Sequence, residues 1–222
     1  YFKQQGITDL VVDLRYNGGG YLAIANALAY SVAGRAQAQG KVFEWIYFSD
    51  KRSSENYAVN FTNFGLNNQA YPSLDIAKVY VLVTGGTCSA SESFINGLRG
   101  IDVPVELIGS TTCGKPYGFY PQDNCGITYA AMEMEGLNAK LEGRFSDGIV
   151  PQCTVLDDLN YPLGDASERM LSVAIKRMQG KSCSQAADLV KSSQALFGMA
   201  LRDDSVLLRP DWQTNKFLNP KP

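Results

Sequence analysis

The chain contains no histidine among its 222 residues. A Ser-His-Asp triad cannot be built from a chain without an imidazole, so a nucleophilic serine in this chain would need a different base. Zinc sites that combine cysteine with histidine are excluded for the same reason, and no two of the five cysteines have C-x-x-C spacing. We therefore expect neither a metal nor another cofactor.

Two further absences narrow the classes of partner. No apolar run approaches the roughly 18 residues of a membrane-spanning helix. The formal net charge is −2 and no basic cluster stands out, so we expect neither a nucleic acid nor a membrane surface as partner. The sequence begins with Tyr1 rather than Met and enters a predicted strand almost at once. We therefore expect a further N-terminal part in the full protein.

What is present is an alternation of short apolar runs and helical patterns, typical of the α/β class. Continuous apolar runs predict buried parallel strands at 8–14, 78–84 and 105–109. Apolar residues at helical spacing predict helices at 21–32, 90–98, 166–178 (capped by Asp165) and 185–201. Further strands are predicted at 41–48 and at 126–135, the latter paired with 137–141, and 50–75 reads as an irregular excursion. We expect a core domain over 1–183 and a helical C-terminal extension and tail over 184–222.

Small residues directly follow three of the predicted strands, at 17–20, 85–91 and 109–115. The carboxyl ends of parallel strands are where sites assemble in α/β folds, over exposed helix N-termini. Ser89 would sit at the first turn of its helix, where the Ala90 amide could donate to an oxyanion. Lys115 could serve as its base, because burial disfavours a charged amine and lowers its pKa toward neutrality.

Four segments, in this order, resemble the signature segments of the C-terminal processing peptidases, also called tail-specific proteases. They are Asp13-Leu14-Arg15-x-Asn17-x-Gly19-Gly20, Ser89-Ala90-Ser91-Glu92, Gly109-x-x-Thr112-x-Gly114-Lys115 and, more weakly, Asp147-Gly148-Ile149-Val150-Pro151. The resemblance implies a ClpP/crotonase-like core with a mixed, mainly parallel sheet and flanking helices. It also implies a serine endopeptidase that cleaves polypeptides near unstructured C-terminal ends. Such proteins are exported to the periplasm or cell surface, and many carry a PDZ domain, which would lie upstream here.

Residue by residue, the resemblance makes Ser89 the nucleophile and Lys115 the general base. The Ala90 amide and a glycine amide, Gly20 before Gly19, would form the oxyanion hole. Many members place a glutamine four residues after the lysine to orient the amine, but Phe119 stands there in this chain. Gln122 is the nearest candidate for that orienting role, although it is out of register.

Other interpretations of the same residues stay open at this point. Ser89 could be an ordinary helix cap and Lys115 a solvated loop lysine. The scaffold could also be a non-catalytic module that holds an apolar ligand with its aromatic-rich stretch 43–64, or a crotonase-type acyl-CoA enzyme. Asp13 and Arg15 are expected to form an ion pair that braces the loop. Glu92 is expected to be structural, favoured by the helix dipole.

The cysteines favour an oxidising compartment if they pair. Two bridges are considered, Cys113 with Cys125 across a predicted hairpin and Cys153 with Cys183. Cys88 is interpreted as a small packed residue, with a rival role as nucleophile in place of Ser89.

Overall fold

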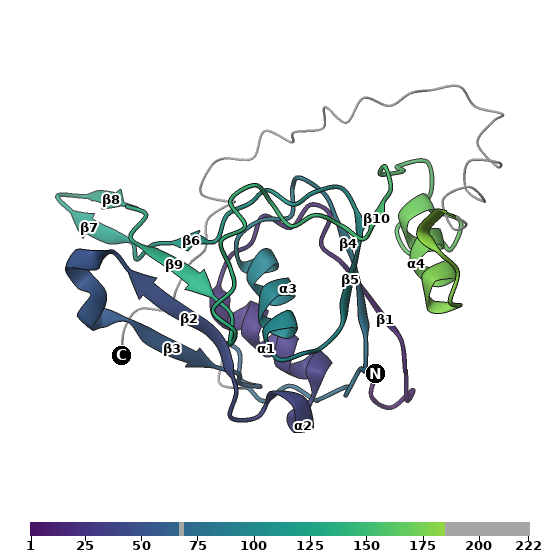
Figure 1. The fold of residues 1–222 in the computed structure, drawn as a ribbon, viewed down its shortest axis with the longest axis horizontal. Helices are drawn as coiled ribbons and strands as arrows, with labels where there is room; N and C mark the ends of the chain where they lie inside the picture. Colours follow the sequence, from purple (N-terminus) through teal and green to yellow (C-terminus); the bar gives the residue numbers. More distant parts are fainter. Residues whose placement is uncertain (67–68, 185–222) are drawn as a thin grey trace.

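The computed structural model describes residues 1–66 and 69–184. It has the expected α/β class, with a parallel sheet and flanking helices. Figure 1 shows four layers, namely an outer helix, a parallel sheet, a pair of helices and an antiparallel sheet. The expected helix at 185–201 and nearly all of the expected C-terminal extension lie outside the described residues.

The parallel sheet forms the centre and has the order β1-β4-β5-β10. Its strands are β1 (Leu10–Asp13), β4 (Val79–Val83), β5 (Val105–Gly109) and β10 (Cys153–Thr154). All five residues of β4 are buried, because Val79, Val81 and Val83 face one cluster of apolar side chains while Tyr80 and Leu82 face a second. Burial on both faces explains why the sequence shows an unbroken apolar run here rather than an alternation.

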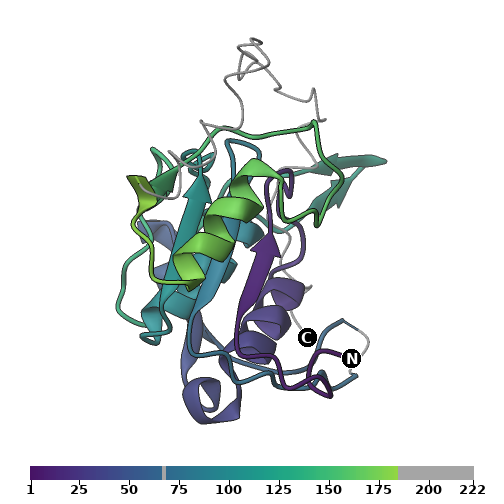
Figure 2. The same ribbon diagram turned by 90° about the vertical axis from the view of Figure 1, so that its right-hand side faces the viewer.

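Helices cover both faces of this sheet. The helices α1 (Leu22–Ala33) and α3 (Ala90–Gly100) pack side by side on one face, and the short α2 (Arg35–Ala38) follows α1. α4 (Arg169–Met178) covers the opposite face, as the turned view in Figure 2 shows. Gly34 ends α1 with a φ of 80°. None of the helices in the described part of the chain is long and apolar enough to cross a bilayer.

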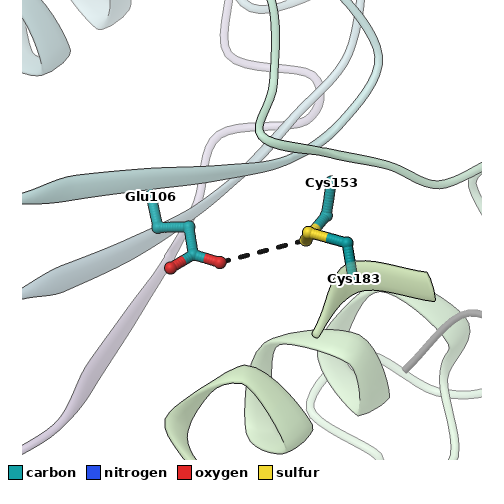
Figure 3. A group of neighbouring side chains, drawn as sticks. All are labelled: Glu106, Cys153 and Cys183. Carbon is teal, nitrogen blue, oxygen red and sulfur yellow. Dashed lines mark hydrogen bonds between the residues drawn. A yellow bond between two sulfur atoms is a disulfide. The ribbon is translucent and has the colours of Figure 1, made fainter. Parts of the chain in front are cut away.

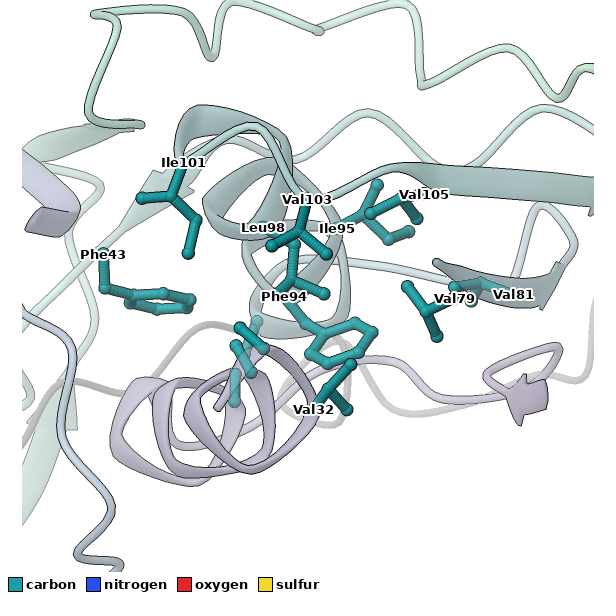
Figure 4. Close-up of a cluster of buried hydrophobic side chains, with 14 of the residues drawn as sticks. Val32, Phe43, Val79, Val81, Phe94, Ile95, Leu98, Ile101, Val103 and Val105 are labelled. Atoms are coloured by element: carbon teal, nitrogen blue, oxygen red, sulfur yellow. The ribbon is translucent and has the colours of Figure 1, made fainter. Parts of the chain in front are cut away.

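The larger apolar core fills the space between the parallel sheet, α1, α3 and the antiparallel sheet (Figure 4). Phe94 from α3 reaches between Val32 of α1 and the valines of β4, while Phe43 comes from the antiparallel side. A Cβ at Gly97 would lie 2.4 Å from the Phe43 ring, so the glycine lets that ring pack directly on the helix. This core holds α3, and with it Ser89, against the sheet.

The antiparallel sheet has the order β3-β2-β9-β6. Its strands are β3 (Tyr57–Asn60), β2 (Val42–Phe48), β9 (Met134–Leu137) and β6 (Tyr117–Gly118). The excursion at 50–75 contains β3 and a 3-10 helix, η1 (Asp50–Glu55).

The predicted pairing of 126–135 with 137–141 is wrong. The hairpin consists of β7 (Gln122–Asn124) and β8 (Ile127–Tyr129), and β9 pairs with β2 instead. Cys125 and Gly126 both have positive φ, 51° and 75°, which is the two-residue turn that reverses a chain tightly. The reversal therefore comes earlier than the sequence pattern suggested.

The helix predicted at 166–178 is shorter than expected, because it begins at Arg169. Glu168 is the cap, and its carboxylate accepts the amides of Met170 and Leu171. Asp165 instead accepts the amide of Ser167 in the turn before the helix.

The predicted bridge between Cys153 and Cys183 is confirmed, on the α4 side of the parallel sheet (Figure 3). Glu106 lies beside it and pairs with Lys78 and Arg177. Burial raises the pKa of Glu106, but its two cationic partners outweigh that effect, so the pKa lies below its ordinary value. Cys153 and Cys183 could bind a metal next to Glu106 only as free thiolates. Here their two sulfur atoms are bonded to each other instead (Figure 3).

The predicted bridge between Cys113 and Cys125 is wrong. Cys113 is bonded to Cys88, and Cys125 is exposed in the β7–β8 turn without a disulfide partner. Cys88 is therefore half of a disulfide rather than simply a packed residue. Its sulfur is not available as a nucleophile in this structure.

Candidate active site

Ser89 stands in a sharp turn between β4 and α3. Its φ and ψ are 59° and −116°, a conformation that a residue with a side chain rarely adopts and that costs about 1–3 kcal/mol. The side chain is fully buried, and its Oγ has no hydrogen-bond partner among the described residues. A strained serine between a strand and a helix is the arrangement that presents a nucleophile in several hydrolases. A buried hydroxyl without a partner is the kind of exception that calls for a functional explanation.

The loop that carries Lys115 is held against this turn by one buried carboxylate, that of Glu92. Its Oε2 accepts the backbone amides of Ser89 and Lys115, each at 2.8 Å. The two amide nitrogens are therefore no more than twice that distance apart. Glu92 Oε1 accepts the Gly114 amide at 2.9 Å and the Thr112 hydroxyl at 2.5 Å. All four acceptor positions of this carboxylate are used.

The segment 147–151 packs directly on the lysine loop. Thr112 Oγ1 accepts the Ile149 amide at 2.7 Å, while it donates to Glu92. A Cβ at Gly114 would lie 2.3 Å from the Ser146 carbonyl oxygen, and a Cβ at Gly148 would lie 2.2 Å from that of Thr112. Both glycines also have positive φ, so this contact requires glycine on each side.

The Asn17–Gly20 loop docks on the first turn of α3 from the other side. The Asn17 carbonyl accepts the Cys88 amide at 3.1 Å and the Ser91 hydroxyl at 3.0 Å. A Cβ at Gly19 would lie 2.8 Å from Ser89 Cβ, so the absence of a side chain allows this approach. The three small-residue loops predicted to converge after the strands therefore do meet around Ser89.

Two amides at this junction could stabilise an oxyanion. The Gly19 amide is occupied, because it donates to Asn17 Oδ1 at 3.0 Å. No described residue accepts a hydrogen bond from the amides of Gly20 and Ala90. Of the two glycines proposed from the sequence, Gly20 therefore has the available donor.

A disulfide joins the same two loops covalently. Cys88, directly before Ser89, is bonded to Cys113, two residues before Lys115, with the Cα atoms 5.3 Å apart. The Cys113 amide also donates to the Thr87 carbonyl at 3.0 Å. The turn that carries Ser89 and the loop that carries Lys115 are thus linked by a disulfide, by this backbone hydrogen bond and through the Glu92 carboxylate.

The sequence profile of peptidase family S41 matches residues 1–119, which is more than half of the chain. The chain belongs to peptidase family S41. Family S41 is a family of serine-type peptidases. No curated protein matches the chain.

Solved structures agree with the family. A protein from Bacteroides fragilis NCTC 9343 assigned to the S41 proteases superposes with a TM-score of 0.72 at 28% identity, over 81% of this chain and 46% of that one. The photosystem II D1 C-terminal processing protease superposes with a TM-score of 0.52 at 24% identity, over 69% of this chain and 36% of that one. A lipoprotein from Streptococcus agalactiae superposes with a TM-score of 0.56 at 14% identity, over 78% of this chain and 55% of that one. The last two share the fold, and the chain spans about half or less of the length of these proteins.

Family membership makes the position of the Lys115 side chain important. Its Nζ does not hydrogen-bond to Ser89 Oγ in this structure, since that oxygen has no partner among the described residues. Hydrogen bonds between catalytic groups are often long in an empty site and shorten once substrate binds. Gln122, the candidate for orienting the amine, is exposed in the β7–β8 hairpin, which projects from the body of the molecule (Figure 1). Its position gives no support to that role.

Arg15, at the base of the Asn17–Gly20 loop of this S41 domain, is almost fully buried and bonds to three carboxylates. These belong to Asp13 at 2.7 Å, Asp157 at 2.7 Å and Glu168 at 3.1 Å. Burial lowers the pKa of Arg15, but Asp13 and the other two carboxylates outweigh it and raise the pKa above its ordinary value. The predicted ion pair is confirmed and is larger than expected, because it joins the loop to the start of α4.

An apolar hollow of about 100 Å³ opens beside Ser89. It begins at Gly19 and Ala90 and runs along the exposed side of α1. Tyr21, Ile24 and Leu28 line it and are between 40% and 52% exposed. This hollow was not predicted from the sequence, although apolar residues spaced by three and four along one helix were its signal.

Proposed function

We propose that this S41 domain is a serine endopeptidase that works through a Ser89–Lys115 dyad. The observation that carries the proposal is the convergence of the Ser89 and Lys115 amides on one carboxylate oxygen of Glu92. It keeps the two residues adjacent in a chain that has no histidine to serve as base. The strained backbone of Ser89 supports the same role.

In the proposed reaction, Ser89 Oγ adds to the carbonyl carbon of the scissile peptide while its proton passes to Lys115 Nζ. The amides of Ala90 and Gly20 donate to the oxyanion, and each such donor contributes about 2.7–4 kcal/mol to transition-state stabilisation. The C–N bond then breaks, and Lys115 gives its proton to the leaving amine. Water hydrolyses the Ser89 ester in the same way, with Lys115 again as base.

The substrate in this proposal is an unstructured polypeptide, cut near its C-terminal end. The D1 C-terminal processing protease, which has the same fold, is named for such a reaction. Because Ser89 is fully covered, the scissile bond must enter with a displacement of the neighbouring loops. The hollow over α1 would receive an apolar side chain next to the cleaved bond.

We also propose that the protein acts outside the cytosol. The two disulfides of the described residues support an exported protein, because such bridges persist in oxidising compartments and are rare in the cytosol.

The test compares cleavage of an unfolded polypeptide by the native protein with cleavage by Ser89→Ala and Lys115→Ala. Each variant should lose about 10⁴-fold or more in kcat while keeping its melting temperature. Ser54→Ala and Lys51→Ala, both at exposed positions of η1, are the matched controls and should keep full activity. Full activity in Ser89→Ala would refute the proposal.

One observation favours a second candidate, a module that binds an apolar ligand without catalysis. A second apolar hollow of about 280 Å³ shares Ile24 and Leu28 with the first and continues along α1 toward Tyr71. A fluorophosphonate probe separates the two candidates. Covalent labelling at Ser89 supports the peptidase, whereas saturable binding of a fatty acid without any labelling supports the binding module.

A further inference from the structure

The inference about the Cys88–Cys113 disulfide rests on the proposed function. If that function holds, the disulfide occupies an unusual place. It joins the residue before the proposed nucleophile to the loop of the proposed base, across 25 positions of sequence. The sulfur atoms therefore form a covalent connection between the two halves of the dyad, parallel to the hydrogen bonds of Glu92.

Opening this bridge must move one or both halves. A disulfide holds its sulfurs about 2 Å apart, whereas sulfurs that are not bonded to each other need roughly 3.5 Å or more. Cys88 has little room to move by itself, because it is 5% exposed and its amide and carbonyl are bonded to Asn17 and Ser91. The displacement therefore falls on the strained turn at Ser89 or on the lysine loop. Either movement changes the distance on which proton transfer depends.

We propose that the Cys88–Cys113 bridge is a redox modification site, opened by dithiols, whose oxidised form is the active form of the peptidase. A thiolate of the dithiol attacks Cys113 Sγ, because Cys113 is the less buried of the two cysteines. The S–S bond breaks, and Cys88 leaves as a thiolate that takes up a proton. The second thiol of the reductant then attacks the mixed disulfide. It releases the Cys113 thiol and forms a cyclic disulfide, so two electrons pass from the dithiol to the protein. Re-oxidation reverses both steps.

The other cysteines provide an internal comparison. The Cys153–Cys183 bridge lies on the α4 side of the parallel sheet (Figure 3). The helix α3, which Ser89 directly precedes, lies on the other side of that sheet (Figure 1). Cys125 lies at the exposed hairpin turn. Reduction at these positions should leave the dyad in place.

The experiment uses the purified protein with Cys125→Ser, Cys153→Ala and Cys183→Ala, in which one reducible bridge remains. Cleavage of an unfolded polypeptide is measured before and after dithiothreitol treatment, with the bridge followed by alkylation and mass spectrometry. We expect kcat to fall about tenfold or more on reduction, KM to stay within about twofold, and re-oxidation to restore kcat. A Cys88→Ala/Cys113→Ala variant with the other bridge intact should have the low kcat and not respond to dithiothreitol.

The outcomes separate the two proposals. Unchanged kcat with the bridge shown open overturns the redox site and leaves the peptidase proposal standing. An oxidised protein that cleaves nothing refutes the proposed function, and the redox site with it. If the triple variant does not fold, the native protein is titrated with dithiothreitol instead. If kcat falls in step with the alkylation of Cys88 and Cys113, the redox site is supported. If kcat falls in step with the alkylation of Cys153 and Cys183, the redox site is overturned.

Discussion

Replacing Glu92 by glutamine tests whether the lysine loop is positioned by this one carboxylate. The side chain is fully buried and accepts hydrogen bonds from four donors, and three of these come from residues 112–115. Glutamine keeps the shape of the side chain but turns one of its two acceptor atoms into a donor. Whichever way the amide faces, two of the four incoming hydrogens then meet an NH₂ group.

The structure indicates which orientation costs less. With the amide oxygen toward Ser89 and Lys115, the NH₂ group faces Thr112 and Gly114. The Thr112 hydroxyl can rotate to accept, but the Gly114 N–H cannot, so one buried backbone donor is left without a partner. Hydrogen bonds to charged groups are worth about 1.5–3 kcal/mol each, so we expect a loss of about 2–4 kcal/mol in unfolding free energy. This corresponds to a melting temperature lower by about 5–15 °C.

The effect on catalysis should exceed what stability explains. Once the Gly114 amide is released, the lysine loop can shift relative to Ser89, and a displacement of this kind costs about 10–100-fold in kcat. Because Glu92 does not line the apolar hollow, KM should change little. Steady-state cleavage of an unfolded polypeptide at 25 °C, well below the melting temperature, gives kcat and KM separately.

Glu106→Gln is the matched control. Glu106, like Glu92, is a buried carboxylate. It pairs with two cations and faces α4 rather than Ser89. We expect it to lower the melting temperature by a similar amount and to leave kcat unchanged. Native kcat in Glu92→Gln, or an equal loss of kcat in Glu106→Gln, would refute the positioning argument.

Three further changes test other parts of the structure. Gly19→Ala should lower kcat about tenfold or more, because its Cβ would lie 2.8 Å from Ser89 Cβ. Gly40→Ala, with a positive φ but open space around it, should affect stability only, and equal kinetics for the two variants would contradict the clash. Ile24→Asp should raise KM about tenfold for a substrate with an apolar side chain at the cleaved bond, with kcat within about twofold, and an unaltered KM would exclude the hollow as a substrate site. The pKa of Glu106 lies below its ordinary value of 4.5, so its contribution to stability is complete above that pH and is lost as the pH falls through the folded-state value. Urea unfolding from pH 6 to pH 3 should therefore show a steeper loss of stability in the native protein than in Glu106→Gln, and parallel curves would contradict this.

The central strands were predictable because burial on both faces leaves a direct mark on the sequence. β5 has the predicted bounds, and β4 lies within the predicted run. The pairing of the strands after residue 120 was not predictable from the pattern, because β7 and β8 have three residues each and are exposed. Strands this short carry too few apolar positions to specify their partner, and the turn at Cys125 decides the pairing instead.

The candidate site was predictable as a set of loops but not as a set of contacts. Glycines and small residues after strands indicated where the loops would meet, and Ser89 and Lys115 lie in two of them. Glu92 was expected to be structural, but its part in holding the lysine loop was missed, because the helix dipole already explains a carboxylate in the first turn. Its other partners lie 20 to 23 positions away, beyond any local pattern. The partner of Cys113 was misassigned for the same reason, since its bond to Cys88 depends on this long-range contact.

The contacts around Ser89 also bear on which group could take its proton. Glu92 is the carboxylate in contact with the Ser89 backbone, but its four acceptor positions are filled by donors that hold the site together. If Glu92 accepted the serine proton, it would release one of those donors and loosen the lysine loop at the moment of reaction. Cys88, the neighbouring sulfur, is bonded to Cys113 and offers no thiolate. With imidazole absent from the whole chain, Lys115 is the basic side chain whose backbone these contacts bring to Ser89. A Lys115→Arg variant should therefore be inactive although it keeps the positive charge, because a guanidinium cannot accept the proton.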